Sequence, residues 1–166
     1  VEYSRMTPEV RDQLQKVIDQ VAPRFDHVLL DTGAGISDVV LYTVSLADEV
    51  LVVATPEPTS MTDAYATIKV LATTQGRRAI HLLANQTRKP SEGRSVRIQL
   101  QQVVDRYVSP GLGEAVLLDL IGDIPADPAV RECVQRRQLL LHTLPGAPAA
   151  IAMVAVATRM VGAVAA

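Results

Sequence analysis

The sequence predicts an α/β fold in which helices flank a doubly wound, mostly parallel β-sheet. Two observations lead to this fold class. Short apolar runs of strand length alternate along the chain with longer stretches of helical periodicity, and turns rich in glycine or proline separate them. The chain also has 166 residues, which is enough for one domain with a substantial core. We therefore expect a single domain over residues 1–166 with no internal linker.

The first part of the chain predicts two helices and two strands. Thr7 is a suitable N-cap for a helix that starts at Pro8 and carries apolar residues at helical spacing up to Val21. The apolar run 27–31 is too short for a helix and lacks alternation, so it predicts a strand buried on both sides. The following elements are expected to be a helix near residues 37–47 and a strand over residues 49–55.

The second part of the chain continues the same alternation. The predicted elements are helices near residues 60–74 and 91–108 and strands over residues 79–85 and 116–121. Asp127 then caps a helix with Pro128 at its first position. Pro148 opens a last, alanine-rich helix whose only charged residue is Arg159, and we expect it to be buried in the core rather than to span a membrane.

The charge balance and the cysteine count limit the possible partners and compartments. There are 16 Lys and Arg residues against 18 Asp and Glu residues, for a net charge of −2. This balance excludes a broad basic face for many phosphates, so DNA is not an expected partner. The single Cys133 has no partner for an internal disulfide, and no apolar leader opens the chain. We therefore expect a cytoplasmic location.

Ligands of an open parallel sheet bind at the carboxyl ends of its strands, and the first such end carries Asp31, Gly33 and Gly35. A carboxylate in this position can hold Mg²⁺ through its water shell. Backbone without side chains lets an amide approach a γ-phosphate. A plain strand-to-helix turn with Asp31 as an ordinary cap fits the same residues. On spacing alone, both interpretations remain open.

Three further strand ends carry polar groups. Asn85 offers a carboxamide that can pair with the edge of a purine, although an Asx turn also explains it. Residues 122–127 could line such a base or form only a turn and a helix cap. In segment 55–64, Asp63 follows a cluster of hydroxyls, where Thr59 or Ser60 could be the N-cap and Asp63 could complement the helix dipole.

Three segments together resemble a known family. Residues 27–37 resemble the Walker B and switch II segment of the MinD/ParA class of P-loop ATPases. Their Asp-Thr-Gly-Ala-Gly form is similar to that of the flagellar-number regulators called FlhG or FleN. Residues 55–66 resemble that subfamily more specifically, and residues 124–131 resemble the loop that flanks the adenine. The resemblance covers nearly the whole chain and implies a P-loop NTPase fold of the SIMIBI, MinD-like type.

The resemblance also implies ATP and Mg²⁺ as cofactors and assigns roles to residues. Asp31 would place the metal ion and serve as the catalytic residue of this chain. Gly33 and Gly35 would bind the phosphates, with the backbone of Gly35 at the γ-phosphate. Asp63 matches an acidic position near the partner and dimer surface. The residues implied to contact adenine are Asn85, Pro125 and Asp127.

The phosphate-binding loop of the family does not occur in these 166 residues. A P-loop ends in Gly-Lys-Thr or Gly-Lys-Ser, because backbone amides and a lysine neutralise the phosphates. The three lysines are Lys16, Lys69 and Lys89, and none of them follows a glycine. Because the P-loop and switch I precede the matched region in this family, the chain resembles the C-terminal portion of such an ATPase. We expect the isolated chain to hydrolyse no ATP.

The family implies a function for the full-length parent and two alternatives stay open. The parent would be an ATPase that sets flagellar number and placement through ATP-dependent homodimerisation and switching between partners or the inner face of the cell membrane. Its partners would be an FlhF-like GTPase and, in some lineages, a flagellar transcription activator. One alternative is a non-catalytic binding module that uses the Asp63 helix and the arginine-rich region 77–106. The other is a ParA-type partition ATPase, against which the Thr-Gly-Ala-Gly turn argues.

Overall fold

The computed structural model describes residues 7–164 of the chain. It divides into two compact units, residues 1–50 and residues 51–166. The outer boundaries of the predicted domain, residues 1 and 166, lie outside the described residues. A single domain over the whole chain therefore stays a prediction.

The first unit consists of helices joined by irregular segments. Its elements are α1 (Pro8–Val21), the short 3₁₀ helix η2 (Ala22–Arg24) and α2 (Asp38–Ser45). α1 begins as predicted, because the Thr7 hydroxyl accepts a hydrogen bond from the amide of Val10 at 3.5 Å. Two contacts join α1 to α2: the Tyr42 hydroxyl donates to the carbonyl of Arg11 at 3.1 Å, and the Arg11 guanidinium lies 5.0 Å from the Tyr42 ring.

The predicted strand over residues 27–31 is wrong, because this segment has no regular secondary structure. Its Leu29 side chain is 83% exposed and Val28 is 43% exposed. A strand that is apolar on both faces is stable only where neighbouring strands bond its amides and other layers cover its faces. The sheet formed within the described residues contains three other strands and leaves this segment unpaired.

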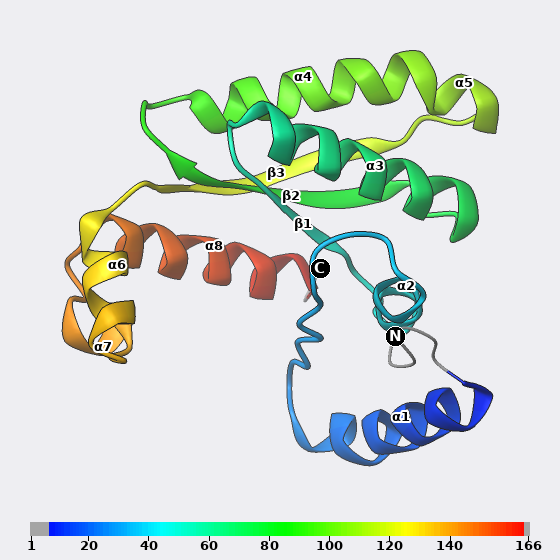
Figure 1. Cartoon of the computed structure of the whole chain (residues 1–166), viewed down its shortest axis with the longest axis horizontal. Coiled ribbons are helices and arrows are strands. Elements are labelled where there is room, and N and C mark those ends of the chain that lie inside the picture. The colour runs from blue at the N-terminus through cyan, green and yellow to red at the C-terminus, as the bar shows by residue number, and fades with distance from the viewer. Residues whose placement is uncertain (1–6, 165–166) are drawn as a thin grey trace. The chain divides into compact units, whose positions relative to one another are not determined.

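The second unit contains a three-stranded parallel sheet (Figure 1). Its strands are β1 (Leu51–Ala54), β2 (Ala79–Thr87) and β3 (Leu117–Pro125), in the order β1-β2-β3. β1 connects to β2 through α3 (Pro58–Thr74), and β2 connects to β3 through α4 (Glu92–Tyr107) and the short α5 (Ser109–Leu112). The helical crossovers and parallel pairing confirm the predicted α/β class.

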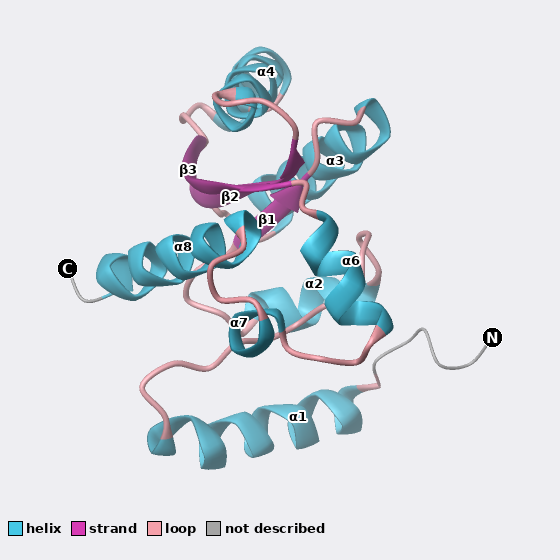
Figure 2. Cartoon of the chain, turned by 90° about the vertical axis from the view of Figure 1, so that its left-hand side faces the viewer, coloured by secondary structure: helices cyan, strands magenta, loops and turns pink. Residues whose placement is uncertain are grey.

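Helices cover both faces of this sheet. α3 and α4 lie on one face, and α8 (Pro148–Val164) lies on the other, so the strands are sandwiched between them (Figure 2). Leu82 at the middle of the central strand is fully buried. On the α8 side, Ile121 and Ile124 of β3 pack with Val156 and Ala149. The chain passes from β3 to α8 through α6 (Pro128–Gln135) and α7 (Leu140–Thr143).

Two glycines let the helices approach the sheet closely. A Cβ atom at Gly93 of α4 would lie 2.9 Å from the Cβ of Asp123, and a Cβ atom at Gly122 of β3 would lie 2.6 Å from Cγ2 of Val156. Both distances are too short for a real side chain, so each position accepts only glycine without a shift of the helix.

β3 extends four residues beyond its predicted end. The expected turn at residues 122–127 therefore begins only after Pro125, and Gly122 and Asp123 belong to the strand. The register of β2 and β3 also shifts at Leu82/Leu83 and again at Asn85/Thr87. Within residues 7–164, no helix combines the length and the apolar character that a membrane crossing requires.

Candidate nucleotide-binding edge

The carboxyl ends of the three parallel strands lie at one edge of the sheet, where ligands of such folds bind. The pairing of β2 with β3 sets Asn85 opposite Ile124 and Thr87 opposite Pro125. Asp127 follows two residues after Pro125 and begins α6. The three residues implied to contact adenine, Asn85, Pro125 and Asp127, therefore gather at the same end of the same sheet.

Asn85 is half-buried and uses one of its two polar atoms locally. Its side-chain oxygen accepts a hydrogen bond from the amide of Gln86 at 2.9 Å, and Gln86 has a positive φ of 58°. Such a local bond stabilises the turn at the end of β2. The side-chain NH₂ group of Asn85 has no hydrogen-bond partner among the described residues. Its donors remain available to the acceptor edge of a base, which stays a prediction.

Asp127 joins the starts of two helices. One carboxylate oxygen accepts from the amide of Ala129 in α6 at 2.9 Å, and the other accepts from the amide of Ala149 in α8 at 3.1 Å. The predicted N-cap of α6 is confirmed, and the second bond to α8 was not foreseen. Because a carboxylate has about four acceptor sites, a ligand could still be bound, and the adenine contact stays a prediction.

A hollow of about 240 Å³ lies beside this edge, where β1 and β2 end. Two of its residues, Arg88 and Glu92, belong to the arginine-rich region 77–106, and the amide of Arg88 donates a hydrogen bond to the carboxylate of Glu92. Glu92 lies in the first turn of α4, where an acidic residue is favoured by the helix dipole. The lining residues of this hollow are Thr55, Pro56, Glu57, Pro58, Gln86, Arg88 and Glu92.

The start of α3 differs from its prediction. Glu57 is the N-cap residue and Pro58 takes the first helical position, whereas Thr59 or Ser60 was expected as the cap. The Ser60 hydroxyl instead accepts a hydrogen bond from the amide of Thr55 at 2.9 Å, which fixes the loop after β1. Proline is favoured in the first turn of a helix because amides there have no partner within the helix and proline has no amide hydrogen. This preference places the start of α3 at Pro58, two residues before the predicted start.

The residues implied to bind metal and phosphates lie in the first unit, in an irregular, exposed segment. The Asp31 side chain is exposed and forms no ion pair or hydrogen bond with the rest of the described chain. Gly35 has a φ of +98°, and a Cβ atom at Gly33 or Gly35 would meet nothing within 4 Å. This open backbone fits the close approach of a phosphate.

A resident metal would need ligands besides the side chains of the described residues. Among the described residues, no group of three or more His, Cys, Asp or Glu side chains could hold a metal ion. Mg²⁺ commonly binds through one or two carboxylates together with phosphate oxygens and water, so a lone Asp31 carboxylate is compatible with it. The roles of Asp31, Gly33 and Gly35 stay predictions.

Asp63 lies on the second turn of α3 with its side chain exposed. Its carboxylate forms no hydrogen bond or ion pair with the other described residues. Its backbone carbonyl accepts a hydrogen bond from the Thr67 hydroxyl at 2.9 Å. Its position is compatible with the implied partner or dimer surface, which remains a prediction.

Known proteins are similar to this chain over most of its length. The chain is 36% identical over 155 residues to the antiactivator FleN of Pseudomonas aeruginosa, a match that covers 93% of this chain and 53% of that protein. It is 29% identical over 136 residues to the flagellum site-determining protein YlxH of Helicobacter pylori, with 81% and 44% covered. The chain thus spans about half the length of these curated relatives. No family model matches it.

The fold is shared with solved structures. The MinD cell division protein of Aquifex aeolicus superposes with a TM-score of 0.70 at 24% identity, over 95% of this chain and 61% of that one. The parallel sheet flanked by helices is therefore an α/β fold of the P-loop NTPase-like, MinD-like kind. The sequence matches place the chain in the MinD/ParA-type family as a FleN-like member, and the fold agrees with them.

Proposed function

We propose that this chain is part of a MinD-like ATPase that regulates flagellar number and placement. The observation that carries the proposal is the match to the antiactivator FleN over 93% of the chain. The sheet edge supports it, because Asn85 lies there together with Pro125 and Asp127, which are about 40 residues further along the chain and are likewise implied to contact adenine. A sheet edge of this kind is the usual ligand site of open parallel folds.

The cofactors of the parent would be ATP and Mg²⁺, and several residues of this chain would hold them. Asp31 would hold the metal, and Gly33 and Gly35 would present bare backbone to the phosphates. Asn85 would donate its side-chain NH₂ group to the base, beside Pro125 and Asp127. When bound, Mg²⁺ neutralises negative charge on the transferring phosphoryl group. The protein's contribution is positioning, which is the main source of catalysis in this class of reaction.

The phosphate-binding loop of the parent would come from residues outside this sequence, because none of the three lysines follows a glycine. The parent would bind ATP between two copies, and its other partners would be an FlhF-like GTPase and a flagellar transcription activator. Peripheral attachment to the inner face of the cell membrane would accompany the ATP-bound state. Asp63 would serve the partner or dimer surface, because its exposed carboxylate forms no hydrogen bond or ion pair within residues 7–164.

A non-catalytic binding module is the second candidate, favoured by the same exposed Asp63. The two candidates differ in what precedes Val1 in the source gene. Codons for a Gly-Lys-Thr or Gly-Lys-Ser loop upstream would support the ATPase, whereas an open frame that starts near Val1 would support the binding module. A ParA-type partition ATPase is less compatible with the Thr-Gly-Ala-Gly turn and with the net charge of −2.

Titration calorimetry of the 166-residue chain with Mg-ATP tests whether the main phosphate contacts are supplied by residues outside this chain. Most phosphate contacts would lie outside this chain, so we expect no binding tighter than about 1 mM. The same titration on the full-length parent should give much tighter binding. Micromolar affinity in the isolated chain would contradict the proposal that the main phosphate contacts are supplied elsewhere.

A further inference from the structure

β3 is the last strand of its sheet and has an open edge. It spans nine residues and pairs with β2 alone among the described strands. The amides and carbonyls on its other side therefore have no strand to bond. Such an edge is a template for an additional strand unless the protein covers it.

Side chains of α4 cover only the first part of this edge. The Gln101 carboxamide donates to the carbonyl of Val116 at 2.8 Å and accepts from the amide of Leu118 at 2.9 Å. The Arg97 guanidinium donates to the carbonyl of Leu118 at 3.4 Å. Nothing comparable caps the strand from Leu120 to Asp123 within the described residues. This four-residue stretch is therefore the part that is open to a partner.

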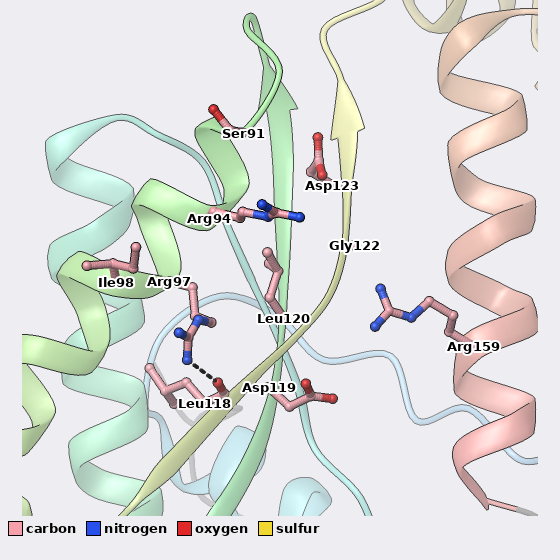
Figure 3. Close-up of a pocket in the computed structure, with 10 residues that line it drawn as sticks. All are labelled: Ser91, Arg94, Arg97, Ile98, Leu118, Asp119, Leu120, Gly122, Asp123 and Arg159. Carbon is pink, nitrogen blue, oxygen red and sulfur yellow. Dashed lines mark hydrogen bonds between the residues drawn. The ribbon is translucent and has the colours of Figure 1, made fainter.

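A groove of about 710 Å³ runs along the open stretch and is bordered by arginines (Figure 3). Arg94 extends from α4 and Arg159 extends from α8, so they reach the edge from helices on opposite faces of the sheet. Both side chains are exposed and neither forms an ion pair or hydrogen bond with the described residues. One positive charge therefore lies on each face of the sheet beside the open edge of β3.

The same groove contains two carboxylates, each with one polar neighbour. Asp119 lies 3.3 Å from Nδ1 of His81 on the neighbouring strand. Asp123 accepts from the Thr87 hydroxyl at 3.3 Å, and Thr87 is itself buried. A hydrogen bond from a neutral hydroxyl leaves the charge of Asp123 in place. The three arginines that line the groove, Arg94, Arg97 and Arg159, outnumber its two aspartates, so the groove has a net positive charge that favours acidic groups.

We propose that the Leu120–Asp123 edge of β3 binds an extended acidic peptide as an added strand. Successive side chains of a strand point to opposite faces of the sheet. Two adjacent acidic residues of the peptide would therefore reach Arg94 on one face and Arg159 on the other, while backbone bonds to β3 supply the register. All residues involved lie in β3, α4 and α8, so the inference does not depend on nucleotide binding.

The test measures the anisotropy of a fluorescein-labelled peptide, Thr-Val-Thr-Glu-Glu-Thr-Val-Thr, titrated with the 166-residue chain. We expect saturable binding that weakens about tenfold in the Arg94→Glu/Arg159→Glu variant, because two exposed ion pairs become repulsions. The Lys69→Glu/Arg106→Glu variant has the same change in charge at exposed positions outside the groove, and it should bind as the wild-type chain does. Replacing both glutamates of the peptide by lysine should abolish binding.

N-methylated peptides separate strand addition from simple charge attraction. Amides of successive residues in a strand point to opposite sides, so only one of the two neighbouring amides can face β3. Methylation of one glutamate amide should abolish binding, and methylation of the other should leave it intact. Hydrogen exchange should also slow at those amides of residues 120–123 that face the open side of β3 when the unmodified peptide is bound.

Several outcomes would overturn the proposal. They are the absence of saturable binding, equal affinity for the wild-type chain and the Arg94→Glu/Arg159→Glu variant, and equal tolerance of both methyl groups. Vesicles of phosphatidylcholine with and without phosphatidylserine provide a further arm. If the chain binds the anionic vesicles through Arg94 and Arg159 but ignores the peptide, these arginines serve a lipid surface and strand addition is wrong.

Discussion

Asp127 and Asn85, at the carboxyl ends of the strands, form hydrogen bonds within the fold and are also the proposed contacts to a ligand. Asp127 binds two amides from different helices, at 2.9 and 3.1 Å, and Asn85 binds the amide of its neighbour. The sequence could predict the cap of α6, because Asp-Pro at a helix start is a local signal. It could not predict the bond to Ala149, because that contact depends on where α8 begins in space, 22 residues further along the chain.

The double role of Asp127 predicts a loss of stability on its removal. We expect Asp127→Ala to lower the free energy of unfolding by about 2–3 kcal/mol, because two helix-start amides lose a charged acceptor. Asp127→Asn should lose less, since one acceptor oxygen remains. Urea unfolding followed by circular dichroism measures both variants. Asp63→Ala is the matched control, and its change should stay below about 0.5 kcal/mol because the side chain is exposed without a partner. An equal effect of the two alanine variants would contradict the joint cap.

At the scale of elements, the sequence predicted the helices and the parallel strands of the second unit well because periodicity and turn residues are local. It failed for residues 27–31, whose apolar character is real but whose strand would require neighbouring strands that the described chain does not offer. It also ended β3 too early, because Gly122 and Pro125 usually mark turns. Gly122 instead provides room for α8, and Pro125 ends an edge strand, where a missing amide costs little.

The packing of α8 on β3 predicts a compensating pair of substitutions. Gly122→Ala should lower the free energy of unfolding by about 1–3 kcal/mol, because the new Cβ would lie 2.6 Å from Cγ2 of Val156. Adding Val156→Ala removes the colliding methyl groups. The double variant should then lose less stability than the sum of the two single variants, by at least about 0.5 kcal/mol. Urea unfolding of the four proteins measures this coupling, and strict additivity would show that the contact does not limit packing.

At the scale of the whole molecule, the sequence predicts the fold more completely than it predicts the nucleotide-binding edge. The register of β2 and β3 brings Asn85 and Pro125 together as a consequence of parallel strand order, which the alternation of elements already indicated. Periodicity contains no information on the nucleotide or on the role of Asp31, and both are expected from the family resemblance alone. The arginine-bordered edge of β3 depends on side chains from two helices on opposite faces, a juxtaposition that has no local sequence signal.

The most direct test of the central claim is ATP turnover by the full-length parent that carries Asp31→Ala. We expect hydrolysis to be abolished, because the carboxylate that would place Mg²⁺ is lost. Asp26→Ala removes an exposed aspartate from the same segment and should leave turnover at the wild-type rate. Turnover of the Asp31→Ala protein that matches the wild type would contradict the assignment of Asp31 and, with it, the proposal that this segment serves a magnesium-bound nucleotide.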